Sequence, residues 1–258
     1  MVPRLLVMLI APVLALALSG AGQPARAAEF SAPQRSEIER IVREYLVGNP
    51  DVIKDAIVEL QRRDKAEEVA SREKVLAENA DTLLRSAHQG VVGNPNGKIT
   101  LVEFYDYNCG YCKRSLADVT KLAKENPDLR IVMKNFPVLG PGSVEAAQVE
   151  AAVRNQFTGD KFFDFHQRLL NAKGHVGKAQ AMAVAKDMGA DMSRLDADMR
   201  KAEVAQGIAE VMGVAEKLAL NGTPSWVLGN EVIVGAVGYD ELREKIGNVQ
   251  KCGKAVCS

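Results

Sequence analysis

The sequence predicts an α/β fold in which a mixed sheet is interrupted by a block of helices and preceded by an N-terminal helical stalk. Three observations predict this fold. Two strand-like stretches flank a helical stretch within residues 99–136, residues 143–220 follow helical periodicity almost throughout, and two further strand-like stretches surround a Gly-Asn turn at residues 229–230. The 33 basic and 33 acidic residues balance, so no basic surface for nucleic acid is expected.

The first residues are typical of a secretory signal peptide. Arg4 precedes an almost wholly apolar run from Leu5 to Leu18, and Ala25-Arg26-Ala27 places small residues where a signal peptidase cuts. We therefore expect residues 1–27 to be removed and the protein to be exported to the periplasm. A retained membrane anchor is the alternative, although the apolar run is shorter than the roughly 20 residues that span a bilayer.

Residues 28–92 predict a helical region with apolar residues along one side. Asn49 is expected to cap a second helix that begins at Pro50. If helical throughout, residues 50–88 would be about 58 Å long, and so narrow an apolar face needs a partner surface. Self-association through residues 30–90 is the preferred hypothesis, and packing against the rest of the chain is the alternative. The apolar residues are Ile38, Ile41, Val42, Tyr45, Leu46, Val52, Ile53, Ile57 and Leu60.

The sheet-forming domain is expected over residues 93–258, after a turn cluster of Asn, Pro and Gly. Its first strand, helix and second strand form a βαβ unit. A helical insertion follows at about 142–220, and a two-residue Gly-Asn turn then joins two strands into a hairpin before a closing helix. The expected strands are 99–105, 129–136, 225–228 and 231–234, and the helices beside them are 111–125 and 239–249.

The chemistry is concentrated at Cys109-Gly110-Tyr111-Cys112, between the first strand and the first helix of this domain. A thiolate attacks disulfides, and a cysteine at a helix N-terminus gains from the macrodipole and free backbone N–H groups, so the pKa of Cys109 should be lowered. Cys112, one helical turn later, should be more buried and should close on Cys109 to release a mixed disulfide. Half of a zinc site, completed by Cys252 and Cys257, is the alternative.

Cys252 and Cys257 end the chain and are expected to form a small structural disulfide, because cysteines of exported proteins are usually paired or redox-active. A second redox site or a metal site is the alternative. No metal or cofactor is expected elsewhere. The three histidines are far apart in the sequence, and the methionines of the helical insertion are expected to fill its core rather than to bind copper.

Three stretches of this domain resemble the DsbA-like branch of the thioredoxin superfamily over residues 93–250. They are residues 102–108 before the cysteine pair, Phe136-Pro137 at the end of the second strand, and Gly222-Thr223-Pro224 before the hairpin. The resemblance implies a thioredoxin fold with an inserted helical subdomain. It also implies that Pro224 is cis and faces the cysteine pair, whereas the residues alone leave an ordinary turn proline as the alternative.

The N-terminal helices also resemble a known segment. Residues 34–60 are similar to the oligomerising N-terminal segment of suppressor-of-copper-sensitivity C (ScsC) proteins. This resemblance implies dimers or trimers, and an activity directed toward disulfide isomerisation or reduction.

The DsbA-like branch carries a buried acid six residues before the first cysteine, which is Glu103 here. Burial would raise its pKa and let it relay the proton of Cys112. Lys134 on the adjoining strand is expected to pair with Glu103, with a purely structural ion pair as the alternative. Strongly oxidising members carry Pro-His between the cysteines, whereas Gly110-Tyr111 offers no cation to the Cys109 thiolate. The disulfide should therefore be less oxidising, and the Gly-Tyr pair, like the threonine before the proline, resembles the dimeric periplasmic isomerases.

The sequence therefore predicts a periplasmic disulfide isomerase or reductase that needs no cofactor and acts as a homo-oligomer. Its expected partners are misfolded or reduced exported proteins, aligned along Thr223-Pro224, and a membrane thiol reductase that keeps Cys109 reduced. A DsbA-type dithiol oxidase is the first alternative, and a copper-binding or copper-tolerance protein is the second.

Overall fold

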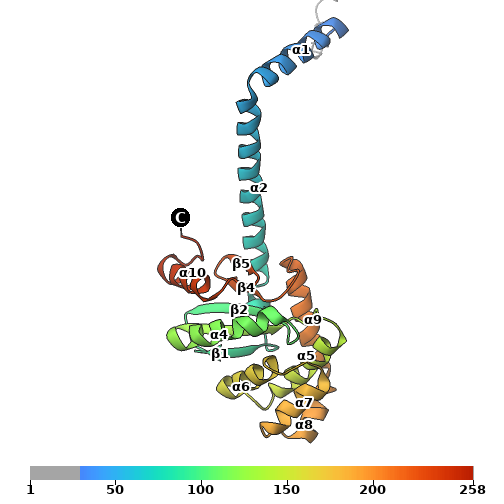
Figure 1. Ribbon diagram of the computed structural model, residues 1–258, viewed down its shortest axis with the longest axis vertical. Helices are drawn as coiled ribbons and strands as arrows, with labels where there is room; N and C mark the ends of the chain where they lie inside the picture. The colour runs from blue at the N-terminus through green and yellow to red at the C-terminus, as the bar shows by residue number, and fades with distance from the viewer. Residues whose placement is uncertain (1–29, 258) are drawn as a thin grey trace, which may run out of the picture. The chain divides into compact units, whose positions relative to one another are not determined.

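The computed structural model describes residues 30–257, so the expected signal peptide lies outside the described residues. The chain divides after Arg62 into two units, which are described separately here. Figure 1 labels their helices and strands in chain order. None of the helices between residues 30 and 257 combines the length and the apolar character needed to cross a membrane.

The first unit, residues 30–62, is called the N-terminal segment below. It consists of α1 (Ala32–Gly48) and the first part of α2 (Pro50–Glu78). The helix α2 begins at Pro50 as expected, and the Asn49 side-chain amide donates to the Tyr45 carbonyl at 2.8 Å at the end of α1. No residue of α1 is buried, and the apolar stripe of the segment is exposed. Its large exposed members are Ile38, Ile41, Val42, Tyr45, Val52, Ile53, Ile57 and Leu60.

The second unit, residues 63–257, is called the compact unit and is built on a five-stranded mixed sheet in the order β1-β3-β2-β4-β5. The neighbours β2 and β3 are parallel, and the other strand pairs are antiparallel. The hairpin of β4 and β5 forms as expected, with Gly229 at a φ of +58° in its turn. The strands are β1 (Gly90–Gly93), β2 (Ile99–Tyr105), β3 (Leu129–Asn135), β4 (Ser225–Leu228) and β5 (Glu231–Val234).

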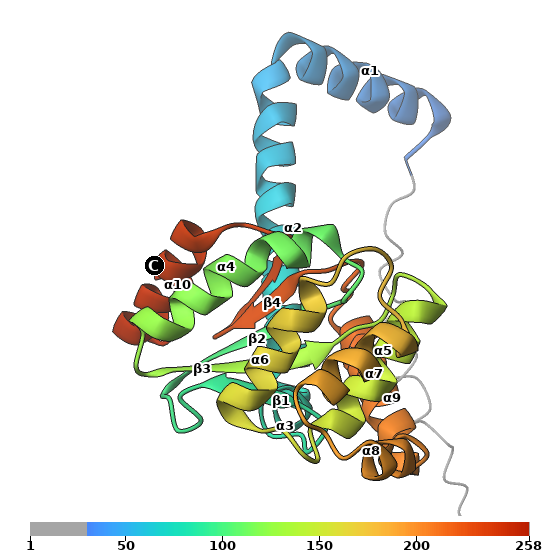
Figure 2. The same cartoon turned by 60° about the horizontal axis from the view of Figure 1, so that its bottom comes forward.

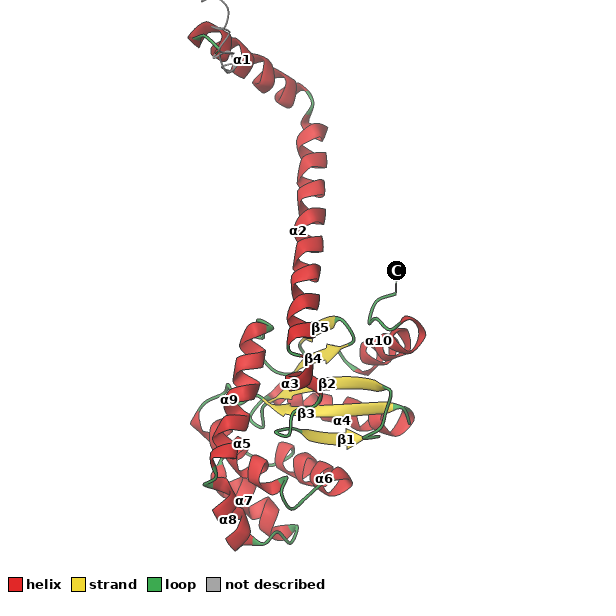
Figure 3. Ribbon diagram, turned by 180° about the vertical axis from the view of Figure 1, so that it is seen from behind, coloured by secondary structure: helices red, strands yellow, loops and turns green. Residues whose placement is uncertain are grey.

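Helices cover both faces of this sheet (Figures 2 and 3). On one face the buried side chains of the strands pack with α4, α10 and most of the inserted helices, and on the other they pack with the end of α2, α3 and α9. The helices α5 to α9 are inserted between β3 and β4. The bounds are α3 (Ala80–Leu84), α4 (Gly110–Glu125), α5 (Pro141–Val153), α6 (Gly159–Leu170), α7 (Lys178–Asp187), α8 (Met192–Met199), α9 (Ala202–Lys217) and α10 (Tyr239–Cys252).

The compact unit begins earlier in the chain than the boundary expected at residue 93. Leu76 near the end of α2 and Leu83 of α3 are only 8% and 2% exposed, and both belong to the core beneath α9. The long helix ends at Glu78, where the Asn79 side chain donates to the Val75 carbonyl at 2.8 Å. β1, which the sequence placed within the helical region, pairs with β3. The last part of the 30–90 region therefore packs on its own chain, whereas the N-terminal segment keeps its apolar surface exposed.

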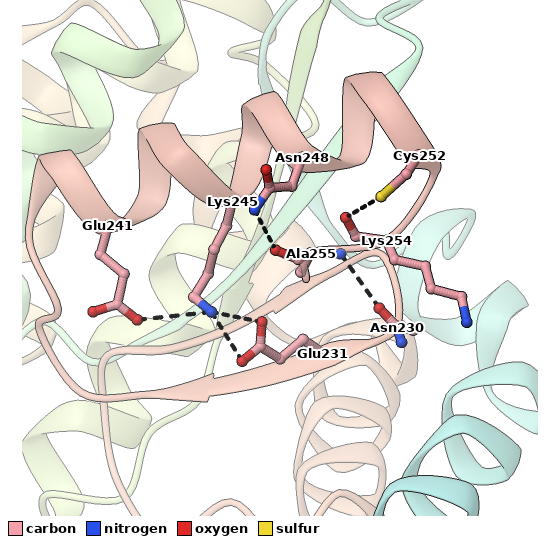
Figure 4. Close-up of polar contacts among 8 residues, drawn as sticks. All are labelled: Asn230, Glu231, Glu241, Lys245, Asn248, Cys252, Lys254 and Ala255. Carbon is pink, nitrogen blue, oxygen red and sulfur yellow. Dashed lines mark hydrogen bonds and ion pairs between the residues drawn. The ribbon is translucent and has the colours of Figure 1, made fainter. Parts of the chain in front are cut away.

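The C-terminal loop is closed by a disulfide between Cys252 and Cys257, with an S–S distance of 2.10 Å. The loop lies against the β4–β5 turn (Figure 4). The Ala255 N–H donates to Asn230 Oδ1 at 3.3 Å, and Asn248 Nδ2 donates to the Ala255 carbonyl at 3.1 Å. The disulfide therefore closes the loop, and the Ala255 hydrogen bonds hold it against the β4–β5 turn and α10.

Candidate active site

Cys109 caps the N-terminus of α4 and lies four residues after Tyr105, the last residue of β2. Its Sγ accepts the Cys112 N–H at 3.3 Å and lies 3.1 Å from the Thr223 carbonyl oxygen, to which the thiol donates when it is protonated. A hydrogen bond from the Cys112 thiol, helped by the backbone N–H groups of Cys112 and Tyr111, lowers the pKa of Cys109 to about 5 although burial opposes this change. At neutral pH Cys109 is therefore largely a thiolate, the form that attacks disulfides.

Cys112 has the opposite properties. Its side chain is completely buried in the first turn of α4, below Cys109. Its hydrogen bond to Cys109, its burial and the nearby charge of Glu103 raise the pKa of Cys112 well above the ordinary value. Cys112 therefore stays protonated while Cys109 carries the charge.

The peptide bond between Thr223 and Pro224 is cis, as the family resemblance implies. Pro224 is buried, and Ser225 Oγ donates to the Gly222 carbonyl at 2.8 Å beneath the loop. Because the Thr223 carbonyl contacts Cys109 Sγ, this loop lies directly beside the more acidic thiol.

Gly110 and Tyr111 lie at the exposed start of α4. The Tyr111 side chain is 60% exposed, and the guanidinium carbon of Arg114 lies 4.1 Å from the centre of its ring. Open space surrounds Gly110 where a side chain would stand. The dipeptide therefore places an aromatic surface, and no charged side chain of its own, next to Cys109.

Glu103 lies on the sheet face that carries the cysteines and is 2% exposed. Burial, with a smaller contribution from the neighbouring thiolate, raises the pKa of Glu103 to about 8. Lys134, the expected partner of Glu103, does not lie beside it. The β2–β3 register sets Lys134 beside Phe104, so it points to the opposite face, where its Nζ donates to the Thr82 carbonyl at 2.5 Å and lies 3.8 Å from Glu210. The predicted Glu103–Lys134 pair is therefore wrong.

Sequence reasoning missed the residues that hold the turn before Cys109. Asp106 accepts a hydrogen bond from the Ser143 hydroxyl at 2.7 Å. The Ser143 Oγ in turn accepts a hydrogen bond from Asn108 Nδ2 at 3.0 Å. Asn108 also bonds both backbone groups of Val176, at 2.7 and 2.9 Å. The partners lie 35 to 68 residues further along the chain, so the only sequence signal was an acid and an amide within an otherwise apolar and aromatic stretch.

His166 is one of the three histidines, none of which the sequence assigned a function. It is buried, which lowers its pKa to about 3 and keeps the ring neutral, and its Nδ1 lies 3.3 Å from the Tyr107 hydroxyl. Within residues 30–257, no group of three or more His, Cys, Asp or Glu side chains is placed to hold a metal ion.

Two family models match the chain. Residues 100–247 match the DSBA-like thioredoxin domain, and residues 34–67 match the N-terminal domain of the copper resistance protein ScsC. The first match covers more than half of the chain and includes the cysteine pair and the cis-proline loop. The second covers most of the N-terminal segment.

Solved structures agree with both matches. A linker-deletion variant of Proteus mirabilis ScsC is 29% identical, with a TM-score of 0.65, and the match covers 88% of this chain and 100% of that one. A thioredoxin-like oxidoreductase from Silicibacter pomeroyi is 37% identical, with a TM-score of 0.63, over 67% of this chain and 98% of that one. The predicted thioredoxin fold with a helical insertion and an N-terminal helical region is thereby confirmed.

Curated relatives include disulfide bond formation protein D of Bacillus subtilis, which is 26% identical over 61% of this chain and 75% of that protein. The Na(+)/H(+) antiporter NhaA 1 of Salinispora arenicola is 25% identical over 59% of this chain, which spans only 23% of the antiporter. The fold, the cysteine pair at the start of α4 and the family matches agree with one another. The chain belongs to the DsbA-like thioredoxin family of thiol–disulfide oxidoreductases, as a member with an ScsC-type N-terminal region.

Proposed function

We propose that this chain is an exported thiol–disulfide oxidoreductase that isomerises and reduces disulfides of other exported proteins. The observation that carries the proposal is the contrast between the two thiols. Cys109, with a pKa of about 5, is a thiolate at the start of α4, and Cys112 beneath it is buried and protonated. One thiol is thus prepared to attack and the other to resolve.

In the proposed reaction, the Cys109 thiolate attacks one sulfur of a client disulfide. A bond forms between Cys109 and that sulfur, the client S–S bond breaks, and the other client sulfur leaves as a thiolate. In isomerisation, a client thiolate then attacks the mixed disulfide and restores the Cys109 thiolate. In reduction, Cys112 loses its proton and attacks Cys109, so the client leaves reduced and the two electrons come from the pair.

Glu103 is the proposed acceptor of the Cys112 proton. Part of its raised pKa comes from the Cys109 charge. When Cys109 enters the mixed disulfide this charge disappears, so the pKa of Glu103 falls and the carboxylate form becomes more accessible. The Glu103 charge also contributes to the raised pKa of Cys112, which supports an interaction between the two groups. The transfer of the Cys112 proton to Glu103 is therefore coupled to the attack of Cys112 on the mixed disulfide, which requires it.

The cysteine environment supports isomerisation and reduction over oxidation. Gly110-Tyr111 supplies no cation to Cys109, and the Cys109 pKa of about 5 lies above the value of about 3.5 for the strongly oxidising DsbA and below about 7 for thioredoxin. A less stabilised thiolate makes the disulfide less oxidising. This activity needs Cys109 reduced at rest, so a membrane thiol reductase is the proposed electron donor.

A dithiol oxidase is the second candidate function. The similarity of this chain to disulfide bond formation protein D favours it.

The N-terminal segment is proposed to join copies of the chain into a dimer or trimer. Its stripe of apolar side chains is exposed, with Ile41, Tyr45 and Ile57 at 52%, 58% and 50%. A contiguous apolar face on a helix is stabilised by burial against another surface, and a second copy offers the same face. Several Cys109 sites would then surround one client, which favours repeated disulfide exchange on that client before it is released.

The test is reactivation of a model enzyme with scrambled disulfides in a glutathione buffer, using the mature protein, Cys109→Ser and Cys112→Ser. We expect recovery that is lost in Cys109→Ser and partly kept in Cys112→Ser, because a client thiol can replace Cys112 in the resolving step. Absence of recovery together with rapid oxidation of a reduced peptide would establish the dithiol oxidase instead.

A further inference from the structure

A groove lies between α4 and α6, with a volume of about 640 Å³, and is called the α4–α6 groove below. Three lysines of α4 line it, and at 3.6 residues per turn they fall on one side of that helix. They are Lys113, Lys121 and Lys124. The side of the groove formed by α6 is uncharged, and Gln167 Nε2 of α6 donates to Thr120 Oγ1 of α4 at 3.0 Å. The groove is therefore a basic one.

The positive charges of the groove have no ion-pair partner. Within residues 30–257, none of the three lysines forms an ion pair, whereas such pairs occur within several other helices. Glu125 follows Lys121 by four residues, which is the spacing of a helical ion pair. Its carboxylate instead accepts the Tyr239 hydroxyl, and Lys121 Nζ lies 3.8 Å from the centre of the Tyr239 ring. The single carboxylate among the described lining residues is thus held by a hydroxyl, opposite three ammonium groups.

The groove begins close to the reactive cysteine. Lys113 follows Cys109 by four residues, and its Nζ donates to the Ala172 carbonyl, just after the end of α6, at 3.1 Å. Because a helix rises 1.5 Å per residue, Lys113 lies roughly 6 Å and Lys124 roughly 22 Å along α4 from Cys109. An extended polypeptide advances about 3.3 Å per residue. A client bound at Cys109 and extended along α4 would therefore meet the lysines about two to seven residues from its own cysteine.

We propose that the α4–α6 groove binds acidic segments of client polypeptides close in sequence to the cysteine that Cys109 attacks. The inference rests on the proposed function, because it names a class of client for the same reactive site. Ammonium groups spread over about 16 Å match carboxylates spaced along one extended chain, and opposite charges speed the encounter of two surfaces. A nucleic acid would need a broad basic face instead, and the chain as a whole carries no net charge.

The test compares two synthetic peptide disulfides that differ only in charge. One carries glutamates at the third and sixth positions before and after its cysteine, and the other carries glutamines there. Both are reduced by the full-length mature protein in its reduced form, and each rate is divided by the rate with dithiothreitol. We expect the wild type to prefer the acidic peptide about tenfold at low ionic strength and less than about twofold at 1 M salt, where the Debye length is about 3 Å.

A triple variant removes the charges of the groove and keeps chain length and helix propensity. Its substitutions are Lys113→Gln, Lys121→Gln and Lys124→Gln. The preference for the acidic peptide should disappear, while the rate for the neutral peptide changes by less than about twofold. The control variant has the same change of charge at exposed positions outside the groove, and it should keep the preference. Its substitutions are Lys178→Gln, Lys186→Gln and Lys254→Gln.

A second measurement separates binding in the groove from an effect on the thiol. Alkylation of Cys109 by iodoacetamide, which is uncharged, should change by less than about twofold in the triple variant. Lys121→Gln with Lys124→Gln leaves the first turn of α4 unchanged and should still lose more than half of the preference. This double variant keeps the test decisive if the change at Lys113 disturbs the fold.

Equal losses on both peptides and on alkylation in the triple variant would overturn the inference, because the lysines would then act on Cys109 itself. A preference that survives 1 M salt or the triple substitution would overturn it as well. A wild type that reduces both peptides equally well would refute the inference and leave the proposed function in place. A wild type that reduces neither peptide would refute the proposed function itself.

Discussion

Ile41 and Ile57 of the N-terminal segment are 52% and 50% exposed, whereas Leu83 and Val132 of the compact unit are 2% and 0% exposed. The compact unit buries its apolar side chains on both faces of one sheet, and that burial stabilises its fold. The apolar side chains along one side of the N-terminal segment are exposed instead. Exposed ion pairs within a helix contribute little to stability, which supports the proposal that this segment packs against an apolar partner surface.

The contrast assigns different tasks to the two regions. In the compact unit, burial raises the pKa of Glu103, and the hydrogen bond to Cys109, together with burial, raises the pKa of Cys112. In the N-terminal segment, the exposed apolar stripe is proposed to set how many reactive sites meet one client.

Charges placed in the apolar stripe should have the largest effect. Ile41→Asp with Ile57→Asp should convert the proposed oligomer to a monomer, because each acid would have to be buried without a partner. Reactivation of a scrambled enzyme should fall about tenfold or more, while reduction of a short peptide disulfide changes by less than about twofold. Sedimentation velocity and the two assays check this. Arg43→Asp, on the opposite side of α1, should change neither, and an unchanged oligomer in the double variant would refute assembly through this stripe.

Glu103→Gln should change how stability depends on pH. The pKa of Glu103 is raised from its ordinary 4.5 to about 8, so the folded state prefers the protonated form. Its stabilising contribution is complete below pH 4.5 and is lost as the pH rises through 8. Relative to the wild type, Glu103→Gln should gain stability between these values, by at most about 5 kcal/mol at about 1.4 kcal/mol per unit.

Denaturant unfolding from pH 4 to pH 9 measures this difference. The exposed Glu39→Gln in α1 is the matched control and should follow the wild type at every pH. A constant difference between Glu103→Gln and the wild type would show that Glu103 titrates at its ordinary pKa in the folded protein.

Truncation of an apolar side chain should have different consequences in the two regions. Leu83→Ala opens a cavity under α9 and should lower the free energy of unfolding by about 2–5 kcal/mol at any protein concentration. Ile57→Ala should lower the melting temperature only to an extent that depends on protein concentration, because it acts on assembly. Thermal unfolding over a hundredfold concentration range distinguishes them. A loss for Ile57→Ala that is the same at every concentration would contradict the comparison.

The C-terminal disulfide should have the smallest effect. Cys252 and Cys257 are five residues apart, so the closed loop is short and its loss should cost at most about 2 kcal/mol by chain entropy. Cys252→Ser with Cys257→Ser should therefore keep full activity and unfold at a slightly lower temperature. A large loss of disulfide exchange in this variant would indicate that the second pair takes part in the chemistry.

Much of the fold could be predicted because its elements are local. The bounds of β2, β4 and β5 follow from short apolar runs and the Gly229-Asn230 turn, and all three are as expected. β1 was missed because its four residues include Gly90 and Gly93, which leave only two strand-forming side chains. The end of α2 was missed because the bond from Lys217 to Asn79 and the burial of Leu83 form only with tertiary packing.

The site residues that belong to a sequence motif could be predicted. The residues whose contacts depend on strand register or on the closure of a loop could not. Cys109, Cys112 and the cis bond before Pro224 follow from spacing and family resemblance. The partner of Glu103 could not be found, because the parallel register that sends Lys134 to the opposite face is not encoded locally. Asp106 was overlooked for the same reason, since its donors become neighbours only after the chain has folded.

The most direct test of Cys109 as the nucleophile is the capture of a client on the Cys112→Ser variant. With Cys112 removed, a mixed disulfide formed by the attacking thiol cannot be resolved within the protein and should accumulate. Incubation with a scrambled-disulfide protein, followed by peptide mapping in mass spectrometry without reduction, locates the linked cysteine. We predict that clients are bound to Cys109 and that Cys252 and Cys257 stay joined to each other. Clients linked to Cys252 or Cys257, or no linked client at all, would contradict the assignment of Cys109 as the nucleophile.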